Sequence, residues 1–392
     1  MSLPRLIVAA GKEKALQRHH PWLFSGAVAR IEGQPEEGDL VEVCTADGHW
    51  MATGHYQSGT IACKVLSFDT RTIDREFFRH RIRSAIAYRE RMGFFAMPTT
   101  NVFRLIHAEG DFLPGLVADW YNGILVLQAH SMGMHRIFPL LAQLMQEELT
   151  PYGLKAIFDK SSATLNLPAA DGYLWGIEPA EWEFTEWGNR MAVNFFEGQK
   201  TGFFIDQRDN RALLERYAHD KSVLNMFCYT GGFSFYAMRG GAKLVHSVDS
   251  SAKAIELTNR NVELNFPGDQ RHEAFCDDAF KFLDASDGQY NLIILDPPAF
   301  AKHRGALHNA LKGYTRLNQK AFEKLPAGGL LFTFSCSQVV TKDQFRQAVF
   351  TAAALAHRKV RILHQLHQPA DHPINIYHPE GEYLKGLVVY VE

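Results

Sequence analysis

Strands and helices alternate along the second half of the chain, and this alternation restricts the possible fold more than any other feature. The apolar runs at residues 222–227, 244–249, 290–296 and 328–336 are typical of buried strands, and the helical stretches between them lie at 233–239, 252–264, 278–284 and 314–324. We expect one further strand before Asp278. Apolar strands that alternate with helices indicate a parallel sheet that is covered on both faces. The sequence therefore predicts a doubly wound α/β domain at residues 187–392.

The beginning of the chain has a different pattern, which is dominated by short strands. Two alternating apolar runs flank the Asp47-Gly48 pair, a strong signal for a β-hairpin, and residues 61–68 read as another strand. We expect residues 1–71 to form a small β-barrel.

The middle of the chain mixes helices and strands. A helix is expected at 72–92, a hairpin around Asn122-Gly123, a helix at 134–149 and a strand at 154–159. Residues 72–186 are therefore predicted to form a small central α/β domain, with an irregular connection near its end.

The composition narrows the class of protein. Hydrophobic residues make up 46% of the 392 residues, which is enough for several cores, and the net charge of −2 gives no sign of a nucleic-acid binder, although a local basic patch can be hidden in such a total. There is no signal-peptide core and no run of eighteen apolar residues, so we expect no membrane span. The five cysteines contain no C-x-x-C pair, which argues against a disulfide framework or a metal site and is typical of the reducing cytoplasm.

Three features follow successive strands of the predicted sheet and indicate a nucleoside ligand. Gly231 and Gly232 form a turn between a strand and a helix, where the backbone can approach a ligand closely. Asp249 ends the next strand, and an acid at this position can bind the two hydroxyl groups of a ribose. Asp278 begins the following helix, where it either accepts a hydrogen bond from an adenine amino group or only caps the helix. The turn is not G-x-G-x-x-G, so the pattern describes an adenosyl ligand without a pyrophosphate.

A stiff turn follows the fourth strand in the sequence LDPPAF. Proline has no N–H group to donate to a sheet, so Pro297 and Pro298 must end the strand. The turn would hold Asp296 and Phe300 at the carboxyl edge of the sheet. An ordinary turn after a strand is the alternative interpretation.

These motifs together resemble a class I S-adenosylmethionine-dependent methyltransferase with a Rossmann-like domain. The whole chain resembles the RlmI-like family, which methylates cytosine C5 in large-subunit (23S) ribosomal RNA. The stretches that carry the resemblance are RHHPWLFSGAV, EGDFLPGLVADWYNG, QKTGFFIDQRDNR, LNMFCYTGGFS, LDPPAF, FTFSCS and ADHPINIYHPEGEYLKG. The resemblance implies a PUA-like RNA-binding domain, a central domain and a methyltransferase domain, in that order. The chain departs from the family after Lys160, where a basic segment that ends in an acid-glycine pair is missing, and this departure leaves the RNA contacts of the central domain open.

The resemblance also implies which residues bind S-adenosylmethionine. The segment QKTGFFIDQ closes over the methionine end of the cofactor in the family, although taken alone its DQRDNR part is typical of a solvated helix start. The cofactor-binding residues that the resemblance implies are Thr201, Phe203, Asp206, Gln207, Phe227, Tyr229, Thr230, Gly231, Asp249, Ser250, Asp278, Ala279 and Asp296.

Cys336 ends a buried strand between two serines and is the predicted nucleophile. Ring carbon C5 of cytosine is a poor nucleophile until a thiolate adds at C6, so cytosine-5 methylation requires a reactive cysteine. Asp296 would hold the N3 and amino edge of the cytosine. A structural role for Cys336 is the alternative, since small thiols are often buried. Ala299 stands where some RNA cytosine-5 methyltransferases carry a second cysteine, which fits a single-cysteine pattern.

RNA contacts are predicted less sharply. Basic residues are frequent in the N-terminal barrel, between residues 71 and 91, and after the LDPPAF turn, where Lys302 begins a cationic run; each of these runs is also typical of a solvated face. Other residues predicted for the base pocket are Pro297, Pro298, Phe300, Asp371, His372 and Trp22, with a structural His-Pro turn and core packing of Trp22 as alternatives. An RNA base N-methyltransferase and a catalytically silent RNA-binding assembly factor are the competing functions. An exposed barrel edge would allow a homodimer.

Overall fold

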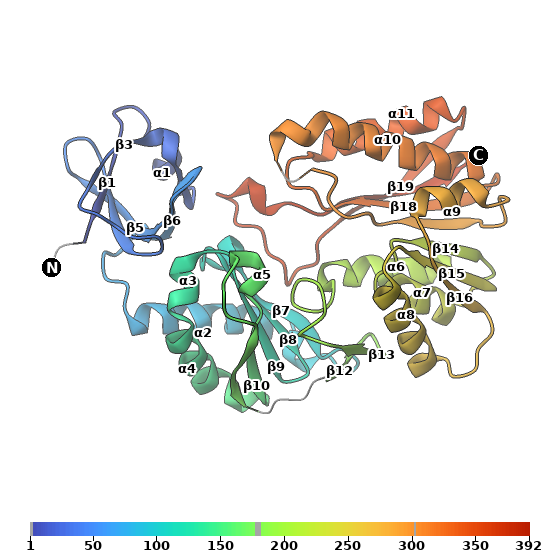
Figure 1. Ribbon diagram of the computed structural model, residues 1–392, viewed down its shortest axis with the longest axis horizontal. Coiled ribbons are helices and arrows are strands. Elements are labelled where there is room, and N and C mark those ends of the chain that lie inside the picture. Colours follow the sequence, from blue (N-terminus) through green and yellow to red (C-terminus); the bar gives the residue numbers. More distant parts are fainter. Residues whose placement is uncertain (1–2, 177–181, 302) are drawn as a thin grey trace. The chain divides into compact units, whose positions relative to one another are not determined.

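The computed structural model describes residues 3–176, 182–301 and 303–392 (Figure 1). The chain forms two compact units, and each is discontinuous in sequence. The first unit contains the residues up to 184 together with 193–203 and 370–381, and the second contains 185–192, 204–369 and 382–392. In the described part of the chain, no helix combines the length and apolar character needed to cross a membrane.

The first unit begins with a six-stranded sheet in the order β2-β6-β5-β4-β1-β3. Its elements are β1 (Arg5–Val8), α1 (Lys14–Gln17), β2 (Trp22–Phe24), β3 (Val28–Glu32), β4 (Leu40–Cys44), β5 (Trp50–Tyr56) and β6 (Ile61–Ser67). The predicted hairpin is confirmed, because β4 and β5 pair antiparallel across the turn that contains Gly48 at φ +87°. Leu6, Val43 and Cys63 lie in the core of this sheet.

A five-stranded sheet in the order β11-β10-β9-β8-β7 follows. Its elements are α2 (Arg75–Arg91), β7 (Val102–His107), β8 (Leu116–Tyr121), β9 (Ile124–Ala129), α3 (Met132–Arg136), α4 (Phe138–Leu149), β10 (Ala156–Asp159), α5 (Ser162–Leu165) and β11 (Gly172–Gly176). Ile82 of α2 and Leu141 of α4 share one core with Leu125 of β9. The predicted Asn122-Gly123 turn is confirmed, with both residues at positive φ, as a two-residue hairpin requires.

Two expectations for this region need correction. The helix expected at 134–149 is interrupted at Ile137: Ser131 caps α3, and a proline in the first turn of α4 starts a new helix. The region expected to be irregular contains the strand β11, which pairs antiparallel with β10. The rest of that region includes residues 177–181, which lie outside the described residues. Beyond them, β12 (Trp182–Glu186) and β13 (Asn189–Val193) form a separate two-stranded sheet.

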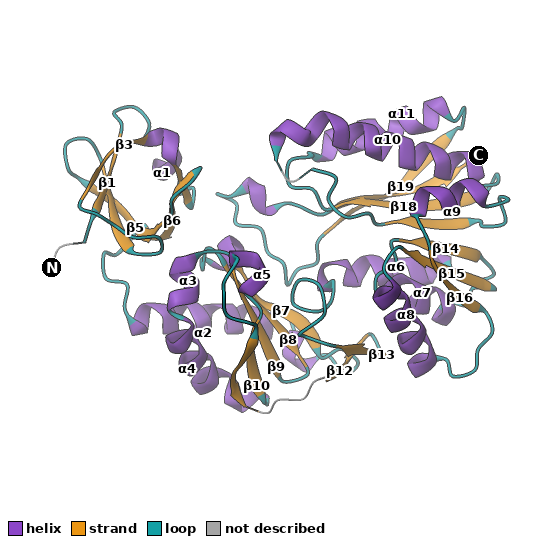
Figure 2. Ribbon diagram, viewed as in Figure 1, coloured by secondary structure: helices purple, strands orange, loops and turns teal. Residues whose placement is uncertain are grey.

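The second unit contains a seven-stranded sheet in the order β16-β15-β14-β17-β18-β20-β19 (Figure 2). Its elements are α6 (Arg208–Tyr217), β14 (Ser222–Met226), α7 (Gly232–Arg239), β15 (Leu244–Asp249), α8 (Ala252–Asn265), β16 (His272–Cys276), α9 (Ala279–Ala285), β17 (Leu292–Leu295), α10 (Leu307–Lys324), β18 (Gly329–Ser335), α11 (Lys342–Leu355), β19 (Val360–His367) and β20 (Lys385–Val391). The strands from β14 to β18 are parallel, and β20 runs antiparallel between β18 and β19.

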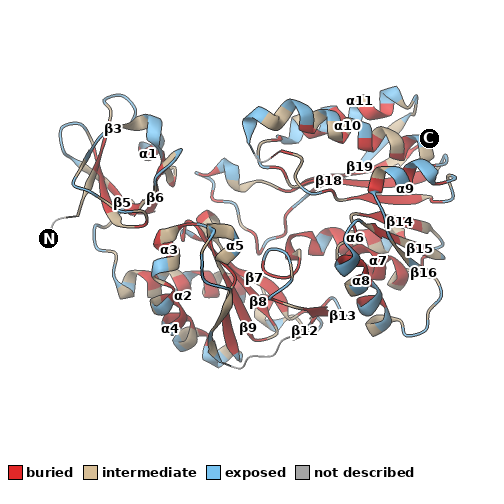
Figure 3. Ribbon diagram, in the orientation of Figure 1, coloured by how far each residue is buried: buried red, intermediate tan, exposed pale blue. Residues whose placement is uncertain are grey.

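Helices cover both faces of this sheet, as the alternation in the sequence predicts. Leu292 and Ile294 of β17 pack in the core formed with α6, α7 and α8, whereas Ile293 and Leu295 pack in the core formed with α9, α10 and α11. Strands β14, β17, β18 and β20 are accordingly buried along most of their length, whereas the edge strands β16 and β19 are largely half-buried or exposed (Figure 3). The Rossmann-like fold class is therefore confirmed, although α10 begins at Leu307, seven residues before the predicted start of that helix.

The order of the strands determines where a ligand can bind. The chain proceeds from β14 to β15 and β16 on one side, then returns to place β17 and β18 on the other side of β14. In open α/β sheets, ligands bind beyond the carboxyl ends of the strands at such a reversal. A ligand site is therefore expected at the turns after β14, β15, β16, β17 and β18.

Candidate active site

The turn after β14 has an unusual backbone. Phe227, Tyr229 and Gly231 all have positive φ angles, of 58°, 48° and 80°. This conformation is unfavourable for the two aromatic residues, so the surroundings must hold it, and such strain is concentrated at functional sites. The amide of Tyr229 donates to Oδ2 of Asp249 at 3.0 Å, and the hydroxyl of Thr258 donates to the carbonyl of Tyr229 at 2.8 Å. The turn is thus fixed from two neighbouring elements.

Asp249 ends β15 with its carboxylate held in a defined orientation. Oδ2 accepts from Tyr229, and Oδ1 accepts from the amide of Ser251 at 2.9 Å. A carboxylate has about four acceptor positions, so two hydroxyl groups of a ribose can still bind. Ser250 follows on the exposed surface. The structure therefore brings the predicted glycine turn and the predicted ribose acid into direct contact.

Asp278 caps α9, as the structural alternative predicts. Its Oδ1 accepts from the amide of Lys281 at 3.0 Å, while the side chain is exposed, and Ala279 next to it is buried. The cap uses one carboxylate oxygen. A contact of Asp278 with an adenine amino group stays a prediction.

The residues at this edge fit an adenosyl cofactor. Thr230 is 5% exposed, and within the described residues its buried Oγ1 has no hydrogen-bond partner, so a polar ligand atom would satisfy it. A methyl group on Gly231 would lie 2.8 Å from Cγ2 of Thr258, so the turn accepts no larger residue there. Both observations describe a turn that is shaped for a bound group.

The predicted segment at 201–207 is divided between the two units. In the second unit, Oδ2 of Asp206 accepts from the hydroxyl of Tyr383 at 2.7 Å, and Nε2 of Gln207 donates to Oδ2 of Asp296 at 3.0 Å. Both side chains are buried. In the first unit, the hydroxyl of Thr201 donates to Asp119 at 2.5 Å, and the amide of Phe203 donates to the hydroxyl of Tyr121. The roles of these four residues in cofactor binding stay predictions.

Cys336 lies beside the LDPPAF turn. The strands β17 and β18 are parallel neighbours, and Leu295 pairs with Thr333, so Asp296 and Cys336 leave the same edge of the sheet. The Sγ atom of Cys336 is 4.0 Å from the carbonyl oxygen of Pro297. Pro297 is buried, Pro298 is exposed, and Cys336 is half-buried.

The two serines that flank Cys336 have structural roles. The hydroxyl of Ser335 donates to that of Tyr314 at 2.9 Å, and the hydroxyl of Ser337 donates to the carbonyl of Ala301 at 2.5 Å. The serines therefore fix the end of β18 on α10 and on the LDPPAF turn. The role of the thiol between them as a nucleophile stays a prediction.

Tyr314 is a residue of this site that sequence reasoning missed. Burial raises its pKa to about 12, and the negative charges of Cys336 and Asp296 act in the same direction. Its ring also packs on Phe300, with centroids 4.6 Å apart. Tyr314 is buried on a helix in no recognisable motif, so only the three-dimensional contacts reveal it. Lys302 lies outside the described residues.

The other four thiols have different surroundings. Burial raises the pKa of Cys228 to about 12 and raises those of Cys44 and Cys63 as well, so none of the three is a thiolate at neutral pH. Cys276 is exposed, with Sγ 3.6 Å from the carbonyl of Ser250. Cys336 is the one cysteine next to the LDPPAF turn.

The remaining predicted pocket residues belong to the first unit. Nε1 of Trp22 donates to Glu109 at 2.8 Å, and the indole ring packs on His378. Asp371 and His372 are buried and hydrogen-bonded to each other at 3.0 Å, and Oδ2 of Asp371 accepts from the amide of Arg104. These contacts agree with the structural alternatives, and a contact of the three residues with RNA stays a prediction.

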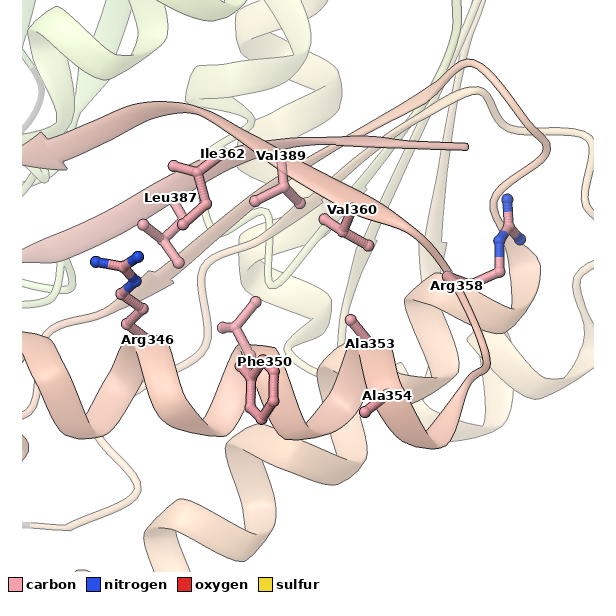
Figure 4. Close-up of a pocket in the computed structure, with 10 residues that line it drawn as sticks. Arg346, Phe350, Ala353, Ala354, Arg358, Val360, Ile362, Leu387 and Val389 are labelled. Carbon is pink, nitrogen blue, oxygen red and sulfur yellow. The ribbon is translucent and has the colours of Figure 1, made fainter.

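A separate cavity of about 300 Å³ lies between α11 and the strands β19 and β20 (Figure 4). Its lining is mostly apolar, with Phe350, Val360 and Leu387 among the side chains and Arg346 and Arg358 as the charged ones. None of the residues predicted for the cofactor or for catalysis lines it. The homodimer stays a prediction.

Comparison with known proteins identifies the family. A model of PUA-like domains matches residues 6–68, and a model of S-adenosylmethionine-dependent methyltransferases matches residues 103–376. "Ribosomal RNA large subunit methyltransferase I" from Klebsiella pneumoniae strain 342 is 39% identical over 402 residues, which cover 99% of this chain and 98% of the relative. The chain belongs to the RlmI-like family of S-adenosylmethionine-dependent methyltransferases. A second RlmI relative, from Escherichia coli strain SMS-3-5, is 38% identical over 398 residues and 99% of both chains.

Solved structures support the RlmI-like fold along the whole chain. A protein from Streptococcus mutans, described as a sam-dependent methyltransferase, superimposes with a TM-score of 0.86 at 23% identity and covers 99% of this chain and 100% of its own. A methyltransferase structure complexed with SAH gives a TM-score of 0.87 with the same coverage. The prediction of the family, of the PUA-like domain and of S-adenosylmethionine as the cofactor is confirmed.

Proposed function

We propose that this protein methylates C5 of a cytosine in large-subunit ribosomal RNA, with Cys336 as the nucleophile. One observation carries the proposal: the half-buried thiol of Cys336 lies at the carboxyl end of β18, next to the LDPPAF turn that presents Asp296. The substrate class is supported by the names of the RlmI relatives, which act on large-subunit ribosomal RNA. S-adenosylmethionine supplies the methyl group.

The residues of the second unit divide the chemistry among them. The thiolate of Cys336 attacks C6 of the cytosine, and the electrons of the C5–C6 double bond then become available at C5. Asp296, oriented by its hydrogen bond from Gln207, holds the N3 and amino edge of the ring. C5 accepts the methyl group as the S–CH3 bond of the methyl donor breaks and S-adenosylhomocysteine is released, and a base then removes the C5 proton. The Sγ–C6 bond breaks, and the thiolate is regenerated.

The cofactor would be held by the turns beyond β14, β15 and β16. Asp249 binds the ribose hydroxyls, the 227–231 turn surrounds the ligand with backbone groups, and Asp278 accepts from the adenine amino group. The target base must leave its stack to reach Cys336. The PUA-like domain at residues 6–68 is the RNA-binding module in this proposal.

The test uses ribosomal RNA from cells that lack the gene. The RNA is incubated with labelled S-adenosylmethionine and with wild type, Cys336→Ala or the control Cys276→Ser, and nucleosides are separated by mass spectrometry. We expect labelled 5-methylcytosine with wild type and with Cys276→Ser, and none with Cys336→Ala. A labelled methylated purine that survives Cys336→Ala would replace this proposal with amino-group methylation, and no label in any variant would indicate a binding protein without activity.

A further inference from the structure

Lys385 is a buried lysine at the active-site end of the sheet. It is the first residue of β20, where it pairs with Ser335, the last residue of β18. Its side chain is 3% exposed. Lysine is rarely buried to this extent without a charged partner, because the ammonium group loses its hydration.

The ammonium of Lys385 binds the turn that follows Cys336. Nζ donates to the carbonyl of Ser337 at 2.6 Å and to the carbonyl of Val340 at 2.6 Å. Across residues 3–176, 182–301 and 303–392, no acidic side chain forms an ion pair with Lys385. The ammonium has three donors, of which the two carbonyls use two. The structure therefore holds a positive charge against the backbone of the turn without a carboxylate to neutralise it.

The charged groups that act on this lysine are Cys336, Glu382 and Lys342. Glu382, before β20, and Lys342, the first residue of α11, form an ion pair with each other. The negative charges of Cys336 and Asp296 both act on the buried Tyr314 of α10. Burial lowers the pKa of Lys385 to about 8, and the thiolate of Cys336 is the strongest charge that opposes this decrease. Because an electrostatic interaction is reciprocal, the ammonium must stabilise the thiolate to the same extent.

We propose that Lys385 is a positioning residue for Cys336, which fixes the 337–340 turn and supplies the positive charge that stabilises the thiolate. The role of Lys385 in catalysis rests on the proposed function, whereas the interaction between its ammonium group and the Cys336 thiolate does not depend on that function. The charge acts twice in the reaction. It favours the thiolate before the attack on C6, and it favours the return of the electron pair to sulfur when the Sγ–C6 bond breaks.

The experiment measures the reactivity of the thiol without RNA or cofactor. Cys336 is alkylated with iodoacetamide between pH 5.5 and 10 in a Cys276→Ser background, and the alkylated peptide is quantified by mass spectrometry, so that the rate reports the thiolate fraction. Lys385→Met removes the charge, Lys385→Gln removes the charge but retains two donors, and Lys385→Arg retains the charge. Lys342→Met is the matched control, since it removes an exposed charge at the same edge.

We expect the wild-type midpoint to lie below the value of about 8.5 for an ordinary thiol. Lys385→Met and Lys385→Gln should raise it by about one pH unit or more, whereas Lys385→Arg and Lys342→Met should stay near wild type. Thermal unfolding of each variant shows whether it keeps the fold. If Lys385→Met does not fold, Lys385→Gln becomes the decisive variant. An unchanged midpoint in a folded Lys385→Gln protein, or equal shifts in Gln and Arg, would overturn the proposal.

The result can be separated from the identity of the methylated base. If the midpoint shifts as expected but the RNA product is a methylated purine, the interaction of Lys385 with Cys336 is retained and the cytosine-5 function is lost. If 5-methylcytosine forms through Cys336 but the midpoint does not depend on the charge of residue 385, the function is retained and the role of Lys385 is lost.

Discussion

Gln207 donates a hydrogen bond from Nε2 to Oδ2 of Asp296 at 3.0 Å, and this bond joins the segment before α6 to the turn after β17. Gln207 is fixed in turn by Asn210, whose Nδ2 donates to its Oε1 at 2.6 Å. The segment predicted to surround the cofactor and the turn predicted to hold the base are thus one hydrogen-bonded structure. A substitution of Gln207 should therefore change the orientation of the Asp296 carboxylate.

Gln207→Leu should reduce the turnover number by about tenfold or more, because a hydrogen bond to a charged group contributes about 1.5–3 kcal/mol and the leucine offers no donor. The measurement is steady-state methyl transfer with separate kcat and KM values for RNA and cofactor. Gln319→Leu, on the exposed face of α10, is the control and should behave as wild type. Equal kcat values for Gln207→Leu and wild type would show that Asp296 does not need this orientation.

Gly231→Ala should weaken cofactor binding strongly. The added methyl group would lie 2.8 Å from Cγ2 of Thr258, and φ of +80° is unfavourable for alanine, so the 227–231 turn must move. Isothermal titration calorimetry with S-adenosylhomocysteine measures the change. Gly268→Ala is a matched control, since Gly268 also has a positive φ but nothing lies within 4 Å of an added methyl group. If both variants lose affinity equally, the turn has no special role.

Acid should destabilise the first unit through His55. This histidine is 3% exposed, and its ring lies so close to Gly133 of α3 that a methyl group on Gly133 would be 2.3 Å from it. Burial lowers the pKa of His55 to about 4, and the positive charges of Lys64 and Arg136 add to the decrease. The unfolded chain therefore binds the proton more readily. The stabilising contribution of neutral His55 is complete above pH 6.5 and is lost as the pH falls towards 4, by about 1.4 kcal/mol per pH unit.

Urea unfolding at several pH values between 7 and 4.5 tests this dependence. His55→Gln, which cannot titrate, should flatten the dependence of unfolding free energy on pH by about one proton, whereas His49→Gln, on the exposed hairpin turn, should not. A slope that is the same in wild type and His55→Gln would show that other groups cause the acid sensitivity.

The sequence predicts the parts of the structure that depend on local pattern. Strands β14, β15, β17 and β18, the Asp47-Gly48 and Asn122-Gly123 hairpins and the family motifs are all readable, because alternation and turn chemistry act over a few residues. The strands β19 and β20 were not identified. Both pair antiparallel at one side of an otherwise parallel sheet, and their positions depend on partners far away in sequence.

The site shows the same division between local and distant information. Gly231, Asp249 and Cys336 stand at strand ends in recognisable motifs. Tyr314 stands in no such motif. Lys385 lies within ADHPINIYHPEGEYLKG, but a lysine at the start of a strand is ordinary by sequence. Only the folded chain brings both residues to the serines that flank Cys336. The segment at 201–207 reads as one motif, yet the chain divides it between two units.

The polypeptide chain passes from one unit to the other repeatedly, at 184/185, 192/193, 203/204, 369/370 and 381/382. The five strands of the β7–β11 sheet lie within residues 102–176, although the unit that contains them also includes residues 370–381. In the second unit, β18 pairs with β20, and α11 and β19 lie between these two strands in the sequence. The strand that ends next to Cys336 therefore gains this neighbour only after α11 and β19 have been synthesised.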